Sequence, residues 1–249
     1  MFNRLCAFAV AALALAGAAR AAEAEPLPSL KEGEVALKSA GPLAFGPQGI
    51  LFVGDPQAAT LYALDTGDRD ATAGKGKPSV EDIGGKIAAL LGTEGGEVQI
   101  KDIAVNPISG NTYLSVARGK GPKAAAVLLK VTPKGDLSEL DLKKIKSANV
   151  EIAGAAEGKS RLEAITHLGY VKGRVLVAGL SNEEFASRLR SIPFPFDKTD
   201  KGTGIEIYHG AHGKFETRSP IRVFTTYKIG DEENVLAAYT CTPLVRMPL

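Results

Sequence analysis

The side chains that could do chemistry are few in this chain, and the three histidines come first. His209 and His212 are spaced so that both imidazoles could bind a transition metal across a turn. No third ligand follows nearby in the sequence and no HExxH helix is present, so a solvent-exposed turn is the simpler interpretation. His167 falls within an expected strand, where it packs or hydrogen-bonds. The histidines therefore do not predict a metalloenzyme.

A loose phosphate-binding pattern occurs at residues 153–160, with Ala153 in place of the usual first glycine. The functional form needs a helix directly after the loop, so that a helix N-terminus faces the phosphates. Here residues 162–168 are expected to form a strand instead, so no nucleotide site is predicted. The sequence also lacks a GxSxG elbow and a CxxCH haem motif.

Repeated strand units must position any site. Four segments share one pattern, a short strand, a tight turn and a strongly apolar strand; they are residues 42–53, 102–116, 164–177 and 221–238. Matching Leu43, Ile103, Ile165 and Val223 gives intervals of 60, 62 and 58 residues. Glycine, proline and asparagine occupy the turns, as hairpins require. The chain is therefore predicted to repeat a unit of about 60 residues.

Further elements complete the units. Third strands are expected at 59–64 and 125–131, a hairpin partner at 137–140, and the last strand of the first unit within 66–101. A short helix is predicted at 86–91, ended by Gly92. A second is predicted after Ser181, with Asn182 as N-cap, one apolar face at Phe185, Leu189 and Ile192, and a stop at Pro193.

Four antiparallel strands per repeated unit is typical of a propeller blade. Over roughly residues 35–249 the chain resembles the broad group of six- to seven-bladed β-propellers. The resemblance implies an all-β fold of about four blades with short helical insertions, and repeats near 40–98, 99–160, 161–219 and 220–249. No WD dipeptide or kelch double glycine indicates a subfamily, and a sandwich or barrel is the alternative fold. Four units are few for a closed ring, so we expect either a truncated propeller or completion of the last blade by another segment or chain.

The resemblance also implies a candidate metal site. Propeller hydrolases of the lactonase and gluconolactonase type hold a central divalent cation with Glu, Asn and Asp, and such oxygen ligands suit Ca²⁺. The counterparts in this chain are Asp55, Asp102, Glu163 and Asn182. Asp102 opens the first strand of the second unit nearly where Glu163 opens that of the third. The alternative is that these are turn and cap residues at strand ends.

A binding face is predicted from the loops. In an up-and-down blade, the loops between the second and third strands and the connections between blades emerge on the same face. The long segments 66–101, 143–161 and 182–202 fall in those places, so this loop-rich face is expected to carry function. The side chains expected on it are Asn182, Glu183, Glu184, Arg188, Arg190, His209 and His212.

Residues 1–21 have the three parts of a secretory signal. Arg4 provides the positive charge, residues 5–17 are apolar, and a small-x-small cleavage site follows at 19–21. The apolar stretch is shorter than the roughly 20 residues that span a bilayer. We therefore expect a secreted or periplasmic protein with no membrane span after cleavage, in which 22–34 form a linker and 35–249 the propeller-like domain.

The net charge and the cysteine content limit the partners and the covalent links that we expect. Removal of the signal takes Arg4 and Arg20 from the 30 basic residues and none of the 28 acidic ones, which leaves no net formal charge. Nucleic-acid binding normally needs a basic excess on one face, so no nucleic-acid partner is expected. Cys241 is then the only cysteine, which excludes an intrachain disulfide, and its apolar neighbours predict a buried thiol.

Two functions follow from these observations. The leading hypothesis is a non-enzymatic extracytoplasmic propeller whose loop-rich face binds a protein or a small molecule, with no cofactor assigned. The competing hypothesis is a lactonase-like hydrolase that uses Ca²⁺ or another divalent cation. A third is that the chain has no activity alone and forms part of a larger secreted propeller.

Overall fold

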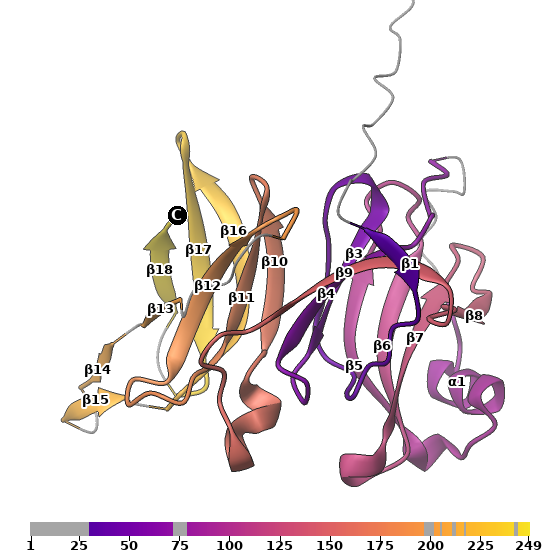
Figure 1. The fold of residues 1–249 in the computed structure, drawn as a ribbon, viewed down its shortest axis with the longest axis horizontal. Coiled ribbons are helices and arrows are strands. Elements are labelled where there is room, and N and C mark those ends of the chain that lie inside the picture. Colours follow the sequence, from indigo (N-terminus) through magenta and orange to yellow (C-terminus); the bar gives the residue numbers. More distant parts are fainter. Residues whose placement is uncertain are drawn as a thin grey trace, which may run out of the picture.

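Strands dominate the computed structural model, which describes residues 30–71, 79–196, 202–204, 206–210, 213–216, 218–241 and 244–249. In these residues the strands form four antiparallel blades in a propeller arrangement and one separate hairpin (Figure 1). The predicted all-β, propeller-like fold is confirmed. The expected signal peptide at 1–21 and His212 lie outside the described residues.

The blades differ in strand number. From inner to outer strand, blade 1 contains β2 (Leu43–Phe45), β3 (Ile50–Asp55), β4 (Thr60–Asp65), β9 (Ile145–Glu151) and β1 (Lys31–Gly33). Blade 2 contains β5 (Val98–Val105), β6 (Thr112–Arg118), β7 (Ala125–Val131) and β8 (Leu137–Glu139). Blade 3 contains β10 (His167–Val171), β11 (Arg174–Leu180), β12 (Ser187–Pro193) and β13 (Thr203–Gly204). Blade 4 contains β16 (Ile221–Ile229), β17 (Glu232–Tyr239) and β18 (Val245–Pro248), and β14 (Ile207–His209) pairs with β15 (Lys214–Glu216) in the hairpin.

The spatial order of the blades differs from their order in the chain. Inner strand β2 lies beside both β5 and β10, and β10 lies beside β16, so the order is blade 2, blade 1, blade 3, blade 4. The cause is β9, which returns from blade 2 and pairs antiparallel with β4 (Figure 1). The fourth strand of the first unit was expected within residues 66–101, and this prediction was wrong. The outer edge of the same blade takes up Lys31–Gly33, part of the expected linker.

The predicted helix after Ser181 is also wrong, because residues 187–193 form strand β12. They pair with β11 over its whole length, from Leu180 opposite Ser187 to Arg174 opposite Pro193. Leu189 and Ile192, which a helix would place on one face, pack into different apolar clusters on the two sides of the blade. Pairing with a buried neighbouring strand outweighs the weak local helical spacing.

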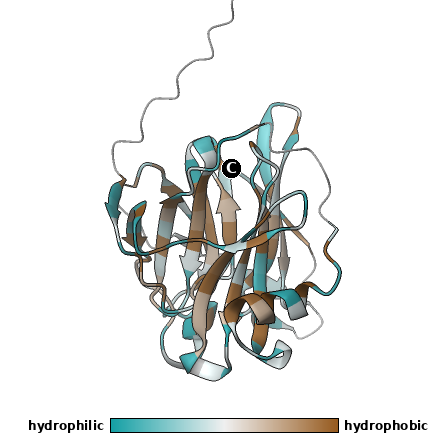
Figure 2. Ribbon diagram, turned by 90° about the vertical axis from the view of Figure 1, so that its right-hand side faces the viewer, coloured by the Kyte–Doolittle hydropathy of each residue, from teal (hydrophilic) through white to brown (hydrophobic). Residues whose placement is uncertain are grey.

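The predicted helix at 86–91 is confirmed as α1 (Ile83–Leu91). The Asp82 side chain accepts a hydrogen bond from the Gly85 N–H at 3.1 Å, and Gly92 ends the helix with a φ of +62°. Ile87 and Leu91 are buried against the outward face of blade 2, with helix α1 in front of the strands in Figure 2. This helix lies on the blade face that has no neighbouring blade.

The core consists of apolar layers between adjacent blades. Phe52 of blade 1 packs edge-on against Phe194 of blade 3, with ring centres 4.9 Å apart. Phe45 of blade 1 meets Tyr113 of blade 2 at 5.2 Å. Ring pairs of this kind prefer particular geometries in addition to burying apolar area, so they help to determine the orientation of each blade relative to its neighbour.

Two further findings concern the exposure of Cys241 and membrane-spanning helices. Cys241 was predicted to be buried, but it is exposed in the loop after β17, where its backbone N–H donates to Ser219 Oγ at 3.1 Å. Ala237 on β17 is buried, but Leu244 on the other side of Cys241 is 63% exposed, so the apolar neighbours do not indicate burial of the thiol. In the described part of the chain, no helix is long and apolar enough to cross a membrane.

Candidate functional site

One cavity of about 730 Å³ lies where the four blades meet. Every blade contributes to its wall: Lys38, Ser39, Ala40, Gly41, Pro42, Pro56, Gln57, Gln99, Lys101, Asp102, Ala117, Gly121, Ala124, Leu162, Ile165, Thr166, His167, Arg222 and Val223. These residues belong to the first halves of the inner strands, to the segments leading into them, and to the loops between second and third strands. The cavity therefore opens on the side where the loop-rich face was predicted, the lower side in Figure 1.

Asp102 lies in the cavity wall and joins two blades. Its Oδ2 accepts a hydrogen bond from the Leu43 N–H of blade 1 at 2.7 Å, and its Oδ1 accepts one from the Ile103 N–H at 2.8 Å. A β-bulge between Ile100 and Asp102 turns the side chain toward blade 1. Oδ2 thus holds β2 against β5, and Oδ1 is occupied by the next backbone N–H of β5 itself.

Arg222 enters the cavity wall from blade 4. Its Nη2 lies 2.7 Å from Oε1 of Glu163, and its Nε donates to Thr240 Oγ1 at 2.7 Å. The ion pair connects blade 4 to the segment that leads into blade 3, and the two contacts hold the guanidinium in one orientation. Matching of the repeats aligns Arg222 with Asp102, each directly before an equivalent apolar residue. That alignment was the sequence signal that could have placed Arg222 at the site.

Asp55 ends β3 and is completely buried beside the cavity. Its Oδ2 accepts a hydrogen bond from the Lys38 N–H at 2.6 Å, and its Oδ1 accepts from Ser39 Oγ at 2.7 Å and from the Ala58 N–H at 3.0 Å. These bonds hold the segment of Lys38 and Ser39, which lines the cavity, against the turn between β3 and β4. Asp55 is therefore a positioning residue for the cavity wall.

His167 lines the cavity at the start of β10, and its ring packs edge-on against Phe224 with centres 4.7 Å apart. Burial lowers the pKa of this imidazole, and the Asp102 charge and a hydrogen bond to the Phe224 backbone oppose the shift without cancelling it. The folded chain therefore favours a neutral His167.

A pH-dependent stability follows from this lowered pKa. Just below the ordinary value of 6.5 the unfolded chain binds the proton more readily than the folded chain. The contribution of neutral His167 to the stability of the fold is therefore fully present above pH 6.5. It is lost as the pH drops toward the lower folded pKa. Melting temperatures of the wild type and His167→Gln, measured between about pH 5 and pH 7.5, should show a steeper acid loss in the wild type. Equal slopes would contradict the assignment.

The four predicted cation ligands do not come together at the cavity. Asp102 is the one member of the set that lines it, whereas Asp55 and Glu163 are engaged by the contacts above. Asn182 is exposed in the loop after β11, where its N–H donates to Gly154 O at 3.2 Å. Among the described residues, no group of three or more His, Cys, Asp and Glu side chains could hold a metal ion. The donor set therefore does not fit a bound divalent cation.

The residues predicted for the binding face have mixed positions. Asn182, Glu183 and Glu184 are exposed in the loop between β11 and β12, and Arg188 forms an ion pair with Glu183. Arg190 was expected on this face but is completely buried, and its Nη2 donates to Ala153 O at 3.3 Å. The backbone of His209 lies in β14, and His212 is outside the described residues.

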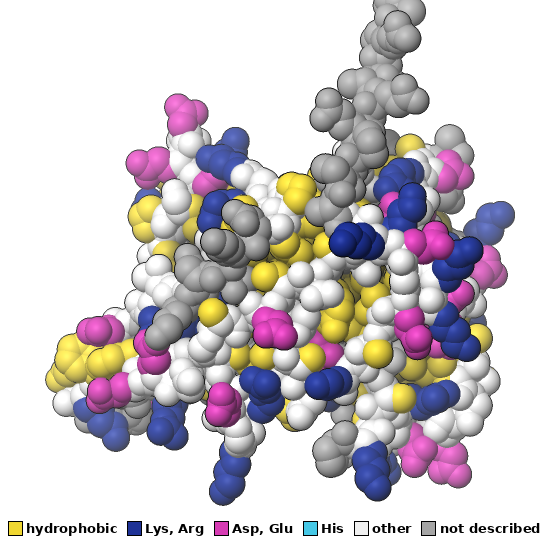
Figure 3. All heavy atoms as spheres, viewed as in Figure 1, with side chains coloured by type: hydrophobic (Ala, Val, Ile, Leu, Met, Phe, Trp, Pro, Cys, Tyr) yellow, Lys and Arg dark blue, Asp and Glu magenta, His cyan; other side chains and the backbone are white. Residues whose placement is uncertain are grey.

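The surface near this loop carries aromatic rings. Tyr208 and Phe215 of the hairpin are 59% and 50% exposed, with ring centres 5.4 Å apart, and Phe185 approaches Phe215 at 6.2 Å. Figure 3 shows apolar atoms at the lower left of the molecule, where this hairpin lies, and basic and acidic side chains interspersed over the rest of that view. That side has no broad basic area of the kind that nucleic acids require.

The segment with the loose phosphate-binding pattern has a different structure. A 3₁₀ turn, Gly158–Glu163, includes the last three residues of the pattern and leads toward β10, and Ala155 forms an isolated bridge with Ser181. A six-residue 3₁₀ turn lacks the aligned helix N-terminus that a phosphate loop needs. The expectation that this pattern makes no nucleotide site agrees with this geometry.

A second polar cluster, missed in the sequence, lies at the other end of the inner strands. We call it the blade 1–2 latch: Asp68 with Asn106, Ser109, Asn111 and Tyr113. The Asp68 carboxylate accepts hydrogen bonds from Ser109 Oγ at 2.8 Å, from Asn111 Nδ2 at 2.9 Å and from the Tyr113 hydroxyl at 3.0 Å.

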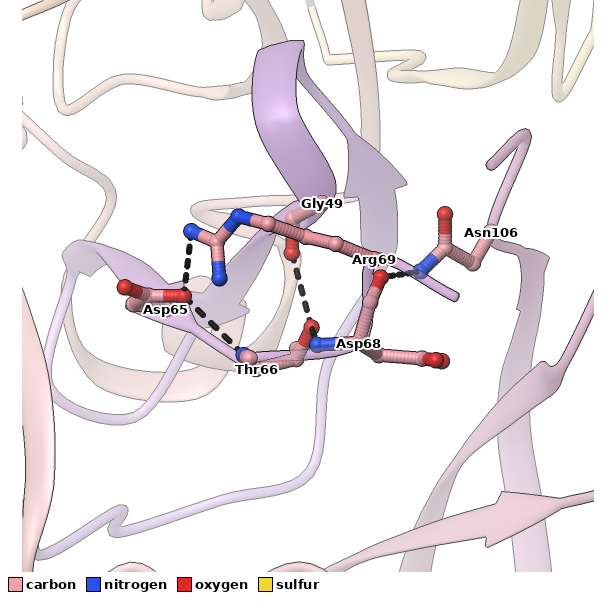
Figure 4. A network of polar contacts seen from close by, with 7 residues as sticks. Gly49, Asp65, Thr66, Asp68, Arg69 and Asn106 are labelled. Carbon is pink, nitrogen blue, oxygen red and sulfur yellow. Dashed lines mark hydrogen bonds and ion pairs between the residues drawn. The ribbon is translucent and has the colours of Figure 1, made fainter. Parts of the chain in front are cut away.

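The backbone of the loop after β4, which carries Asp68, is held by further hydrogen bonds. Asn106 Nδ2 donates to the Asp68 carbonyl at 2.8 Å, and Thr66 Oγ1 donates to the Gly49 carbonyl at 2.8 Å (Figure 4). Burial raises the pKa of Asp68, but the hydrogen bonds to its carboxylate outweigh burial and hold the pKa below its usual value. The latch connects the loop after β4 to the turn between β5 and β6.

Comparison with known proteins does not identify a family. No family model and no curated protein sequence matches the chain. A solved structure titled "Streptogramin B lyase structure" aligns at 10% identity and a TM-score of 0.31, covering 88% of this chain and 72% of that one. At so low a score the fold description depends on the blades themselves. The chain has a β-propeller arrangement. No subfamily is indicated.

Proposed function

We propose that this chain is an extracytoplasmic binding protein that holds a small organic molecule in its central cavity. The observation that carries the proposal is that all four blades line one and the same cavity of about 730 Å³. Sites for small molecules are concave, about 300–1,000 Å³ in volume, and mostly apolar with a few polar groups. The wall here has that character, with Pro42, Ile165 and Val223 beside amides, a histidine and three cations.

The polar groups of the wall favour binding over hydrolysis. The Ser39 hydroxyl donates to Asp55 at 2.7 Å, and the Thr166 hydroxyl donates to the Ile221 carbonyl at 2.6 Å. Neither hydroxyl therefore donates to His167, the imidazole of the wall. The oxygen donors expected for a lactonase-like cation are not gathered at the cavity, so no observation supports the hydrolase alternative.

Filling the cavity tests the proposal. Val223 lines the cavity and is 50% exposed, whereas Ile103, at the equivalent position of blade 2, is 60% exposed and lies outside it. Val223→Trp is expected to weaken binding of an apolar fluorescent probe, N-phenylnaphthylamine, at least about tenfold, because the indole occupies the cavity. Ile103→Trp adds the same ring at the matched position and should leave the affinity unchanged. Equal binding by both variants would overturn the proposal.

Export is part of the same proposal and is supported by the pattern of residues 1–21. The chain expressed with its own N-terminus should be recovered outside the cytoplasm without this segment. The mass of the purified protein measures this directly, and an intact N-terminus on cytoplasmic protein would contradict it.

A further inference from the structure

The charges of the cavity wall are not balanced. Lys38, Lys101 and Arg222 contribute three positive charges, whereas Asp102 is the one acid among the lining residues and Glu163, which does not line the cavity, pairs with Arg222. The chain as a whole is nearly neutral, with 30 basic and 28 acidic residues. The excess of positive charge at the cavity is therefore a local feature of the place where the blades meet.

The two lysines have no acidic partner within the described residues. Lys101 Nζ donates to Gln99 Oε1 at 2.8 Å, which is a neutral amide. The contact that holds Lys38 uses its backbone N–H and leaves the ammonium group unused. The one acid of the wall, Asp102, directs both oxygens to backbone N–H groups. The ammonium groups of the two lysines are thus available to bind a ligand or solvent ions.

Arg222 adds a cation of fixed orientation. Glu163 and Thr240 hold its Nη2 and Nε, and Nη1 makes no hydrogen bond to the described residues. A guanidinium held in place loses little conformational entropy when it binds an anion. Beside it the wall is apolar, since Val223 follows Arg222 directly and Ile165 is 1% exposed. A charged group and an apolar body can therefore be accommodated side by side.

We infer that the ligand of the cavity is an organic anion, an apolar body carrying one carboxylate, sulfonate or phosphate group. The anionic group lies among Lys38, Lys101 and Arg222, and the apolar body lies against Ile165, Pro42 and Val223. This inference rests on the proposed function, since it names the chemical class that the same cavity takes.

The test compares two dyes with nearly the same aromatic body. Anilinonaphthalene sulfonate carries an anionic group, and N-phenylnaphthylamine lacks it. We expect the wild type to bind the sulfonate at least about tenfold more tightly, and raising NaCl from about 50 mM to about 500 mM should weaken the sulfonate alone, because salt screens exposed charges. Fluorescence titration measures both affinities.

Lysine variants test whether the charges that bind the sulfonate group are those of the cavity wall. Lys38→Met and Lys101→Met keep the length and apolar stem of the side chain, and each should weaken sulfonate binding about threefold, or about tenfold together. N-phenylnaphthylamine binding should stay within about twofold, since it has no charge to lose. Lys134→Met, an exposed lysine in the turn between β7 and β8, is the matched control and should change neither affinity. Thermal melts verify that each variant folds.

The outcomes separate the two proposals. If Val223→Trp abolishes binding of both dyes but the lysine variants and salt change neither, the cavity binds small molecules and the anion inference is overturned. If Val223→Trp affects neither dye, or the wild type binds neither, the proposed function fails and the inference fails with it. Selective loss of sulfonate binding in the lysine variants supports both.

Discussion

Replacing Asp68 with alanine is expected to lower the free energy of unfolding by about 3 kcal/mol, because three donors lose a charged acceptor at once. Ser109, Asn111 and Tyr113 would be left facing a gap between blades 1 and 2. Ser109, Asn111 and Tyr113 are all nearly fully buried, so water does not readily replace the carboxylate. Urea denaturation of the two proteins measures the difference.

A pH series gives the same contact an independent signature. The folded pKa of Asp68 lies below its ordinary value of 3.8, so the stabilisation is complete above that pH and is lost as the pH falls through the folded pKa. Asp68→Asn should lack this acid loss. Asp65→Ala is the matched control, since Asp65 forms an i,i+4 pair with the partly exposed Arg69 and should cost less than about 1 kcal/mol. A loss as large as that of Asp68→Ala would contradict the assignment.

Replacing Asp55 with alanine is expected to cost about 3 kcal/mol and also to weaken dye binding in the cavity. The carboxylate is fully buried and accepts three hydrogen bonds, two from Lys38 and Ser39 in the cavity wall. Without it, the three donors lose their acceptor and the wall segment is no longer fixed against the turn after β3. Urea denaturation and fluorescence titration of the same variant measure the two effects.

Two comparisons separate this positioning role from a cation-binding role. Ser39→Ala removes one of the three donors and should cost about 1 kcal/mol, less than the loss of the acceptor itself. Millimolar Ca²⁺ should not change the melting temperature of the wild type, because Asp55, Asp102 and Glu163 are not gathered around one point. A calcium-dependent rise that Asp55→Asn abolishes would show that Asp55 is a ligand after all.

Local patterns predicted the inner hairpins of blades 1, 2 and 4, whereas in blade 3 the strand expected over 162–168 begins only at His167, after a 3₁₀ turn. The turn at residues 46–49 joins β2 to β3 and places Gly49 at a φ of +73°, a conformation that the glycine of the sequence pattern allows. The helix ended by Gly92 is confirmed for the same kind of reason. In both cases the residues that determine the structure are neighbours in the chain.

The same reasoning failed where partners are distant in the chain. Residues 187–193 have weak helical spacing, yet pairing with β11 makes them a strand. Residues 145–151 were expected in the long connecting segment 143–161, but they form β9, and only its pairing with β4, about 85 residues away, shows that it completes blade 1. Local spacing holds no information about which strand edge is free to pair.

The candidate site shows the same division between what local patterns predict and what contacts between distant segments decide. The sequence by itself determined that strand units repeat about every 60 residues, and it placed Asp102 in an inner strand, although that strand begins at Val98 and not at Asp102. Only the tertiary structure decided that Asp102 and Arg222 share one cavity while Asp55 is buried beside it as a support. The physical reason is that periodicity and turn residues act within a hairpin. The order of the blades, and hence which side chains meet, depends on packing between apolar faces far apart in the chain.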